Sequence, residues 1–399
     1  MLPFIIIAIA IFSGFYMAWN IGANDVANSM STAVGAKAIT LRQALIIAAI
    51  LNFLGAVLVG KHVTETIKGK IVDVALMNPH SIMLGFLSAL ISAGLFVTLS
   101  TWKELPVSTT HAIIGGITGF GLIEGGLSVI KWSKLMEVVL SWIISPIAGA
   151  FLSFLIFRII VKTIFSAEKP LKSAKNLSPF FIGLTIFIIF LSIFMKTRIG
   201  EILSYGTVEY IIISFLFGAI AGGIGYAIFR KVKGKGYEIV ERLFKRLQVM
   251  TSCYVAFSHG ANDVANAIAP LAVVFMIAWK EIDAMYLLAF GGIGIAIGIV
   301  TWGYKVIRTV GGRITILTNT RGFSVDFGAA TVVLIASKLG LPISTSHTVV
   351  GAVIGVGLAR GLDAIDLAVI KKIVYSWLFT LPATIVTSIL IYMGLGIIF

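Results

Sequence analysis

The chain has 399 residues, of which 58% are hydrophobic and only 12% are charged, and its mean hydropathy is +1.04. This composition excludes a soluble globular domain and indicates a polytopic membrane protein. The formal net charge of +14 does not indicate a nucleic-acid binder, because the Lys and Arg residues stand in short loops between apolar runs.

Apolar runs of about 20 residues, the length that crosses a membrane, predict an all-α protein with about twelve membrane segments. The runs before the middle of the chain are 4–36, 43–60, 80–101, 106–123 and 135–161, followed by two plainer spans at 179–195 and 207–229. The runs after the basic stretch 230–247 are 248–279, 285–304, 323–337, 342–358 and 365–395.

The first run contains Gly22–Asn28, which reads GANDVAN, and the same letters recur at Gly260–Asn266. Amides and a carboxylate inside an apolar run suggest a broken or unwound helix. An Asp at the centre of a membrane helix costs about 2.5–3.5 kcal/mol, so Asp25 and Asp263 need partners. A distant Lys, a proton and a bound cation are the candidate partners, and the neighbouring Asn oxygens favour a small hard cation such as Na⁺. The alternative is that these Asn and Asp residues only cap two half-helices.

A second duplicated motif begins the fourth run of each half. PVSTTH at 106–111 is matched by PISTSH at 342–347. Proline suits the first turn of a helix and Ser or Thr suits its N-cap, so each motif predicts a half-helix start. Free N–H groups, hydroxyls and the positive end of the helix dipole attract an anion there. The alternative is a pair of ordinary capping boxes.

Three histidines accompany these motifs. His111 and His347 each follow a candidate cap by three residues, and a structural hydrogen bond to the chain is favoured over proton transfer. His259 precedes the second GANDVAN, whereas Ile21 stands in the matching place of the first copy. His259 is therefore not assigned an essential role.

The repeated order of motifs and runs predicts two diverged repeats. Five elements in each half and two spans between them put an odd number of crossings between equivalent points, which predicts inverted topology. The predicted divisions are 1–165 for the first inverted repeat, 166–229 for the two connecting spans, 230–247 for a basic cytoplasmic linker and 248–399 for the second inverted repeat. Broken helices or re-entrant hairpins are expected within the repeats.

The sequence lacks the motifs that are typical of nucleotide-driven pumps and of hydrolases. The sequence has no GxxxxGK[ST] nucleotide-binding motif, no GxSxG motif and no His pair at metal-ligand spacing, so direct ATP drive and an intramembrane hydrolase are disfavoured. The single cysteine, Cys253, excludes an internal disulfide. We therefore predict a protein that is not an enzyme and carries no covalent cofactor.

With both motif pairs in place, the sequence resembles the inorganic phosphate transporter (PiT) family of the sodium/phosphate symporter type, over nearly the whole chain. The resemblance implies symport of phosphate with a cation, sodium in many members and protons in others, and some relatives carry metal phosphate or sulfate. The sodium-coordinating candidates that it implies are Asn24, Asp25, Asn28, Asn262, Asp263 and Asn266. The phosphate-binding candidates are Ser108, Thr109, Thr110, Ser344, Thr345 and Ser346.

The predicted function is import of inorganic phosphate by sodium symport with alternating access. A proton-coupled phosphate, metal-phosphate or sulfate carrier is the alternative, and an anion channel is a rival from another class. The expected partners are phosphate, sodium and the lipid bilayer, with no nucleic acid and with a homodimer left open. The positive-inside tendency predicts a multi-pass protein of the cell membrane whose termini are outside and whose central linker is cytoplasmic.

Overall fold

The structure is a computed structural model that describes residues 2–69, 71–195, 197–234, 236–279, 282–310, 317–361 and 366–399. Regular secondary structure in these ranges is helical, apart from one bridge between Val72 and Ile130. The helices up to residue 165 are α1 (Leu2–Gly35), α2 (Leu41–Val59), α3 (Lys61–Gly69), η1 (Val74–Leu76), α4 (Pro79–Trp102), α5 (Thr109–Gly125), η2 (Gly126–Val129), α6 (Trp132–Ile160) and the π-helix η3 (Val161–Phe165).

The remaining helices are α7 to α9, which have no counterpart before residue 165, and a second series from α10 onward that is similar in order to the first. They are α7 (Pro170–Phe194), α8 (Arg198–Leu203), α9 (Thr207–Arg230), α10 (Tyr237–Trp279), α11 (Ala284–Trp302), α12 (Tyr304–Val310), α13 (Asn319–Lys338), α14 (Thr345–Leu358) and α15 (Leu367–Ile398). Ten helices of the described ranges are long and apolar enough to cross a membrane. With the more polar α13 and the shorter α14 they give the predicted set of segments, which confirms an all-α polytopic membrane protein.

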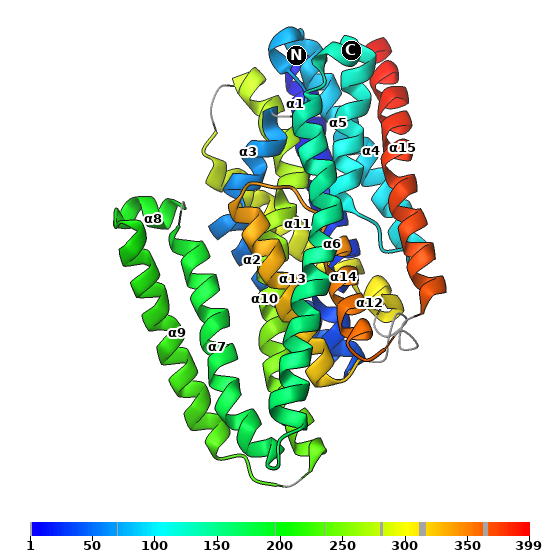
Figure 1. The fold of residues 1–399 in the computed structure, drawn as a ribbon. Coiled ribbons are helices and arrows are strands. Elements are labelled where there is room, and N and C mark those ends of the chain that lie inside the picture. The colour runs from blue at the N-terminus through cyan, green and yellow to red at the C-terminus, as the bar shows by residue number, and fades with distance from the viewer. Residues whose placement is uncertain are drawn as a thin grey trace.

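The bundle and a separate hairpin are visible in Figure 1. Helices α7 and α9 pair with each other and stand beside the bundle, with α7 packed on α10. Both termini lie at one end of the molecule, and the connection from α9 to α10 lies at the other (Figure 1). Residues 237–247 of the predicted linker form the first turns of α10, while Lys235 and the expected start of the last run at Ile365 lie outside the described residues.

The expected break at the GANDVAN segments is wrong. Helix α1 continues through the first copy and α10 through the second, with no unwound turn. The physical reason is that the amide and carboxylate side chains bond to groups on other helices, so the backbone keeps its own i to i−4 hydrogen bonds. Pro270 lies within α10 beyond the motif and does not end the helix.

The glycine of each GANDVAN lies at a close helix crossing. A Cβ atom on Gly22 of α1 would lie 2.0 Å from the Ile295 carbonyl oxygen of α11, and one on Gly260 of α10 would lie 2.0 Å from the Asn52 carbonyl oxygen of α2. Each partner helix also has a glycine at its crossing. Gly298 of α11 lies against the α1 backbone, and Gly55 of α2 lies against the α10 backbone. Backbone contact of this kind fixes the helices that carry the polar residues.

Replacing Gly260 with Ala is expected to destabilise the protein by about 1–3 kcal/mol, because the new methyl group would force α10 away from the α2 backbone. The measurement is the thermal unfolding midpoint of the purified protein. Gly223→Ala on α9 is the control, since no atom lies within 4 Å of that Cβ position. A midpoint that falls equally in both variants would contradict the crossing as the cause.

Candidate functional site

Two helical hairpins meet tip to tip in the bundle. The first is α4 and α5, and the second is α13 and α14. Ser108 and Ser344 are the N-caps of α5 and α14, and their hydroxyl oxygens accept from the backbone N–H groups of His111 and His347 at 3.2 and 3.3 Å. The helix starts predicted from the two Pro-Ser-Thr motifs are therefore confirmed.

The two tips are joined to each other by hydroxyl groups. Thr110 Oγ1 donates to the Ile343 carbonyl at 3.1 Å, and Ser346 Oγ donates to the Val107 carbonyl at 3.2 Å. The first turns of α5 and α14 are thus brought together from positions more than 200 residues apart in the chain. Hydroxyl groups and backbone N–H groups of both helix starts converge on one place.

Asn24 and Asn262 hold the turns of these hairpins. Asn24 Nδ2 donates to Thr101 Oγ1 at 2.9 Å and to the Leu105 carbonyl at 3.1 Å. Asn262 Nδ2 donates in the same way to Ser337 Oγ at 3.1 Å and to the Leu341 carbonyl at 3.2 Å. Their amide nitrogens therefore fasten each hairpin to the helix that carries the carboxylate.

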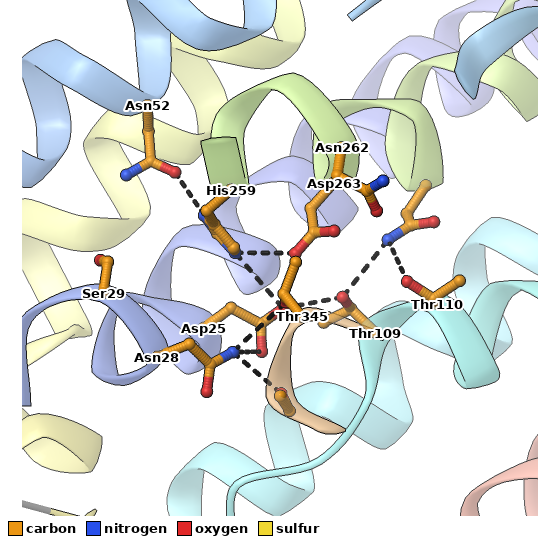
Figure 2. Close-up of polar contacts among 12 residues, drawn as sticks. Asp25, Asn28, Ser29, Asn52, Thr109, Thr110, His259, Asn262, Asp263 and Thr345 are labelled. Carbon is orange, nitrogen blue, oxygen red and sulfur yellow. Dashed lines mark hydrogen bonds and ion pairs between the residues drawn. The ribbon is translucent and has the colours of Figure 1, made fainter. Parts of the chain in front are cut away.

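Each carboxylate accepts a hydrogen bond from the helix start of its own half. Thr109 Oγ1 donates to Asp25 Oδ2 at 2.7 Å, and Thr345 Oγ1 donates to Asp263 Oδ2 at 2.8 Å. Both Asp side chains are buried, at 1% and 0% exposure. The predicted cation and anion residues therefore form one connected cluster rather than two separate sites (Figure 2).

The last residue of each GANDVAN reaches the opposite hairpin. Asn28 Nδ2 donates to Ser346 Oγ at 2.9 Å and to Asp25 Oδ1 at 3.3 Å. Asn266 Nδ2 donates to Thr110 Oγ1 at 3.1 Å and to Thr109 Oγ1 at 3.4 Å. These bonds cross between the halves and place both copies around the same helix tips.

His259 lies between the two carboxylates, although the sequence analysis gave it no role. Its Nε2 is 2.8 Å from Asp263 Oδ2 and 3.9 Å from Asp25 Oδ2, and its Nδ1 bonds to Asn52 Oδ1 (Figure 2). Asp25, His259 and Asp263 are the described acidic and imidazole groups close enough together to hold a metal ion. The sequence feature that indicates this contact is the position of His259 four residues before Asp263, which puts both side chains on the same face of α10.

The chain matches the Phosphate transporter family over residues 21–388. It belongs to this family. A Pyrococcus furiosus protein whose name assigns it provisionally to the phosphate permeases is 51% identical over 98% of this chain and 96% of that protein. The chloroplastic inorganic phosphate transporter 2-1 of Arabidopsis thaliana is 42% identical over 92% of this chain and 68% of that protein.

A solved structure has the same fold as this chain over nearly its whole length. The protein named the sodium-dependent phosphate transporter is 47% identical, with a TM-score of 0.94, over 99% of this chain and 100% of that chain. These findings confirm the resemblance drawn from the duplicated motifs. They also confirm that the protein is a transporter and not an enzyme.

In this phosphate transporter His111 and His347 pack against two tryptophans. The His111 ring lies 3.8 Å from the Trp142 ring and the His347 ring 3.6 Å from the Trp377 ring, between centroids. Each Nδ1 faces a backbone carbonyl of the other tryptophan, at 3.5 and 3.2 Å. The two imidazoles thus connect the hairpin tips to α6 and α15.

Proposed function

We propose that this phosphate transporter imports inorganic phosphate by symport with sodium ions. The observation that carries the proposal is the buried cluster in which hydroxyl groups of two helix starts bond to two carboxylates. His259 is the ion-pair partner of both carboxylates within the described ranges, so the site holds two acidic groups and one basic group. Small cations would offset the remaining negative charge.

The donor set suits sodium. Asp25, Asp263 and the Asn residues beside them offer carboxylate and amide oxygens, which are hard ligands. The buried side-chain oxygens of Asn262 and Asn266 and one oxygen of Asp263 have no hydrogen-bond donor. The relative named the sodium-dependent phosphate transporter, which is 47% identical, supports the same assignment. The sodium residues would thus be Asp25, Asn28, Asn262, Asp263 and Asn266, with Asn24 holding its hairpin turn.

Phosphate would bind at the facing starts of α5 and α14. Thr109, Thr110, Thr345 and Ser346 present hydroxyl groups there, and Ser108 and Ser344 form the caps that keep both helix starts in place. Two helix N-termini favour an anion through their unpaired N–H groups and their dipoles.

The hydroxyl of Thr109 provides a direct link between the two ligands. It donates to Asp25 and accepts from Asn266, so a phosphate oxygen at this hydroxyl would change the hydrogen bonding of a sodium ligand in each half. Thr345 holds the corresponding position, since it donates to Asp263 and accepts from Asn28. The binding of sodium and the binding of phosphate would therefore be coupled, as symport by alternating access requires.

Orientation follows from charge. The termini lie at one end of the molecule, and the basic connection from α9 to α10 lies at the other (Figure 1). Positive loops stay in the cytoplasm, so the termini would be outside and this connection inside. The halves would act as inverted repeats on either side of the site, within the divisions predicted from the sequence.

Uptake of labelled phosphate into liposomes is expected to follow an imposed sodium gradient and to exceed equilibrium. The reason is that sodium neutralises the buried carboxylates before the anion enters. Purified protein is assayed with sodium and pH gradients imposed separately. Accumulation driven by pH alone would favour the proton-coupled alternative, and equilibration indifferent to both gradients would favour an anion channel.

A further inference from the structure

The two copies of GANDVAN are identical in sequence but differ in their hydrogen bonds. In the first copy three of the four side-chain oxygens have a donor. Asp25 Oδ1 accepts from Asn28, Asp25 Oδ2 accepts from Thr109, and Asn24 Oδ1 accepts from the Val107 N–H at 3.2 Å. None of the side-chain oxygens of Asn24, Asp25 and Asn28 is buried without a donor.

The second copy leaves three buried oxygens without any donor. They belong to the side chains of Asn262, Asp263 and Asn266, and each of these side chains is at most 1% exposed. A buried acceptor with no partner destabilises the protein, and more so when it is charged. Three such atoms on neighbouring residues, one of them on a carboxylate, favour a ligand that supplies positive charge.

The difference has a local cause in the second hairpin. The Val107 N–H points at Asn24, but the equivalent Ile343 N–H bonds to the Leu341 carbonyl at 2.9 Å and leaves Asn262 Oδ1 free. Asn266 also bonds only to the opposite hairpin, whereas Asn28 reaches back to its own carboxylate. Asp263 Oδ1 is free for that reason.

The amide orientations follow from the partners. Asn262 faces the Leu341 carbonyl, which can only accept, so its nitrogen is on that side. Asn266 faces the hydroxyls of Thr109 and Thr110, whose hydrogens go to Asp25 and to the Ile343 carbonyl. Both hydroxyls therefore accept from Asn266, and the oxygens of both amides are the atoms left free.

The three residues lie on one face of α10. With 3.6 residues per turn, Asn262 and Asp263 are separated by about 100°, and Asn266 lies between them in angle, one turn further on. Asp263 Oδ2 is already held by Thr345 and His259, which leaves Oδ1 as its available oxygen. One carboxylate and two amide oxygens are ligands for a hard monovalent cation.

We propose that the two copies are not equivalent, and that a sodium ion binds first to the second copy, at Asn262 Oδ1, Asp263 Oδ1 and Asn266 Oδ1, before phosphate enters. This inference rests on the proposed sodium coupling and adds an order to it. In the first copy both carboxylate oxygens of Asp25 already have donors without an ion, so this carboxylate takes part once the second copy is filled.

The test is sodium binding without phosphate, followed as the rise of the thermal unfolding midpoint when NaCl replaces choline chloride at constant ionic strength. Asn262→Ala is expected to lower the apparent sodium affinity at least about tenfold, and Asn24→Ala less than about threefold. Asp263→Asn, which keeps the side-chain shape, is expected to lower the affinity at least as much as Asn262→Ala.

The Asn24→Ala and Asn262→Ala variants together distinguish a loss of sodium binding from a loss of stability. Asn24 makes three side-chain hydrogen bonds and Asn262 makes two, so a purely structural role predicts the larger loss of stability in Asn24→Ala. Equal losses of sodium affinity in the two variants, or no sodium effect on the wild-type protein, would overturn the proposed order while sodium-driven uptake in liposomes still stood. Uptake that ignores sodium would instead overturn the proposed function itself.

Discussion

Sodium-driven phosphate uptake is expected to fall more than about 100-fold when Asp25 is replaced by Asn. The substitution keeps the shape of the side chain and an oxygen that can accept from Thr109, but it removes the charge that would hold a coupling ion. Because Asp25 is 1% exposed, water cannot replace that charge effect. The loss should therefore affect transport much more than folding.

The measurement is uptake by reconstituted protein, normalised to the amount that elutes as a folded species. Asp366→Asn is the matched control, since Asp366 is the N-cap of α15 in an exposed position, and Asn caps helices equally well. If the second copy binds sodium first, Asp25→Asn should still show sodium-dependent stabilisation without phosphate. Normal uptake by this variant would mean that the carboxylate is only structural.

The motifs predicted local structure well where local chemistry decides it. Ser108 and Ser344 are N-caps because a Ser hydroxyl oxygen can accept from the N–H three residues later, which has no partner within the first turn of the helix. The long apolar runs likewise predicted the membrane helices. These features depend on a few neighbouring residues.

The continuity of the helices at GANDVAN could not be predicted from the sequence, because it depends on partners that are distant in the chain. Asn24 and Asn262 look like helix breakers within an apolar run, but their amide groups bond to hairpin turns about 80 residues away. The same is true of the bond between Thr109 and Asp25, which joined two residue sets that the sequence analysis had assigned to different ligands. Periodicity and spacing carry no information about such pairs.

A comparison of the two copies position by position gives no indication of a role for His259. Ile21 occupies the matching place, and the mismatch counted against a role. Helical spacing gave the opposite indication, since residues four apart share a face and His259 thus lies beside Asp263. An asymmetric residue at a site built from two equal motifs is itself a sign that the two sides differ.

The second copy also differs from the first in its free oxygens, and His259 lies on that side. Its imidazole and the Thr345 hydroxyl both hold Asp263 Oδ2, whereas Asp25 Oδ2 has Thr109 at 2.7 Å and the imidazole only at 3.9 Å. The orientation of the Asp263 carboxylate therefore depends on His259 more than that of Asp25 does.

Replacing His259 with Leu is consequently expected to lower the maximal rate of phosphate uptake at least about tenfold. Leucine fills similar space, but it removes the group that lies between two buried carboxylates and leaves Asn52 Oδ1 without its partner. Uptake is measured at saturating sodium and phosphate and divided by the folded fraction, so that a loss of stability alone does not register as a loss of rate.

Ser258→Ala provides the comparison for that result. Ser258 is equally buried on α10 and donates to the Tyr254 carbonyl of its own helix, so this variant tests the loss of a polar group that does not contact the carboxylates. It should transport at close to the wild-type rate. If the His259→Leu protein also transports normally and only its unfolding midpoint is lower, His259 is a packing residue. If the loss of rate is confined to His259→Leu, His259 is one of the groups that orient Asp263 for the cation.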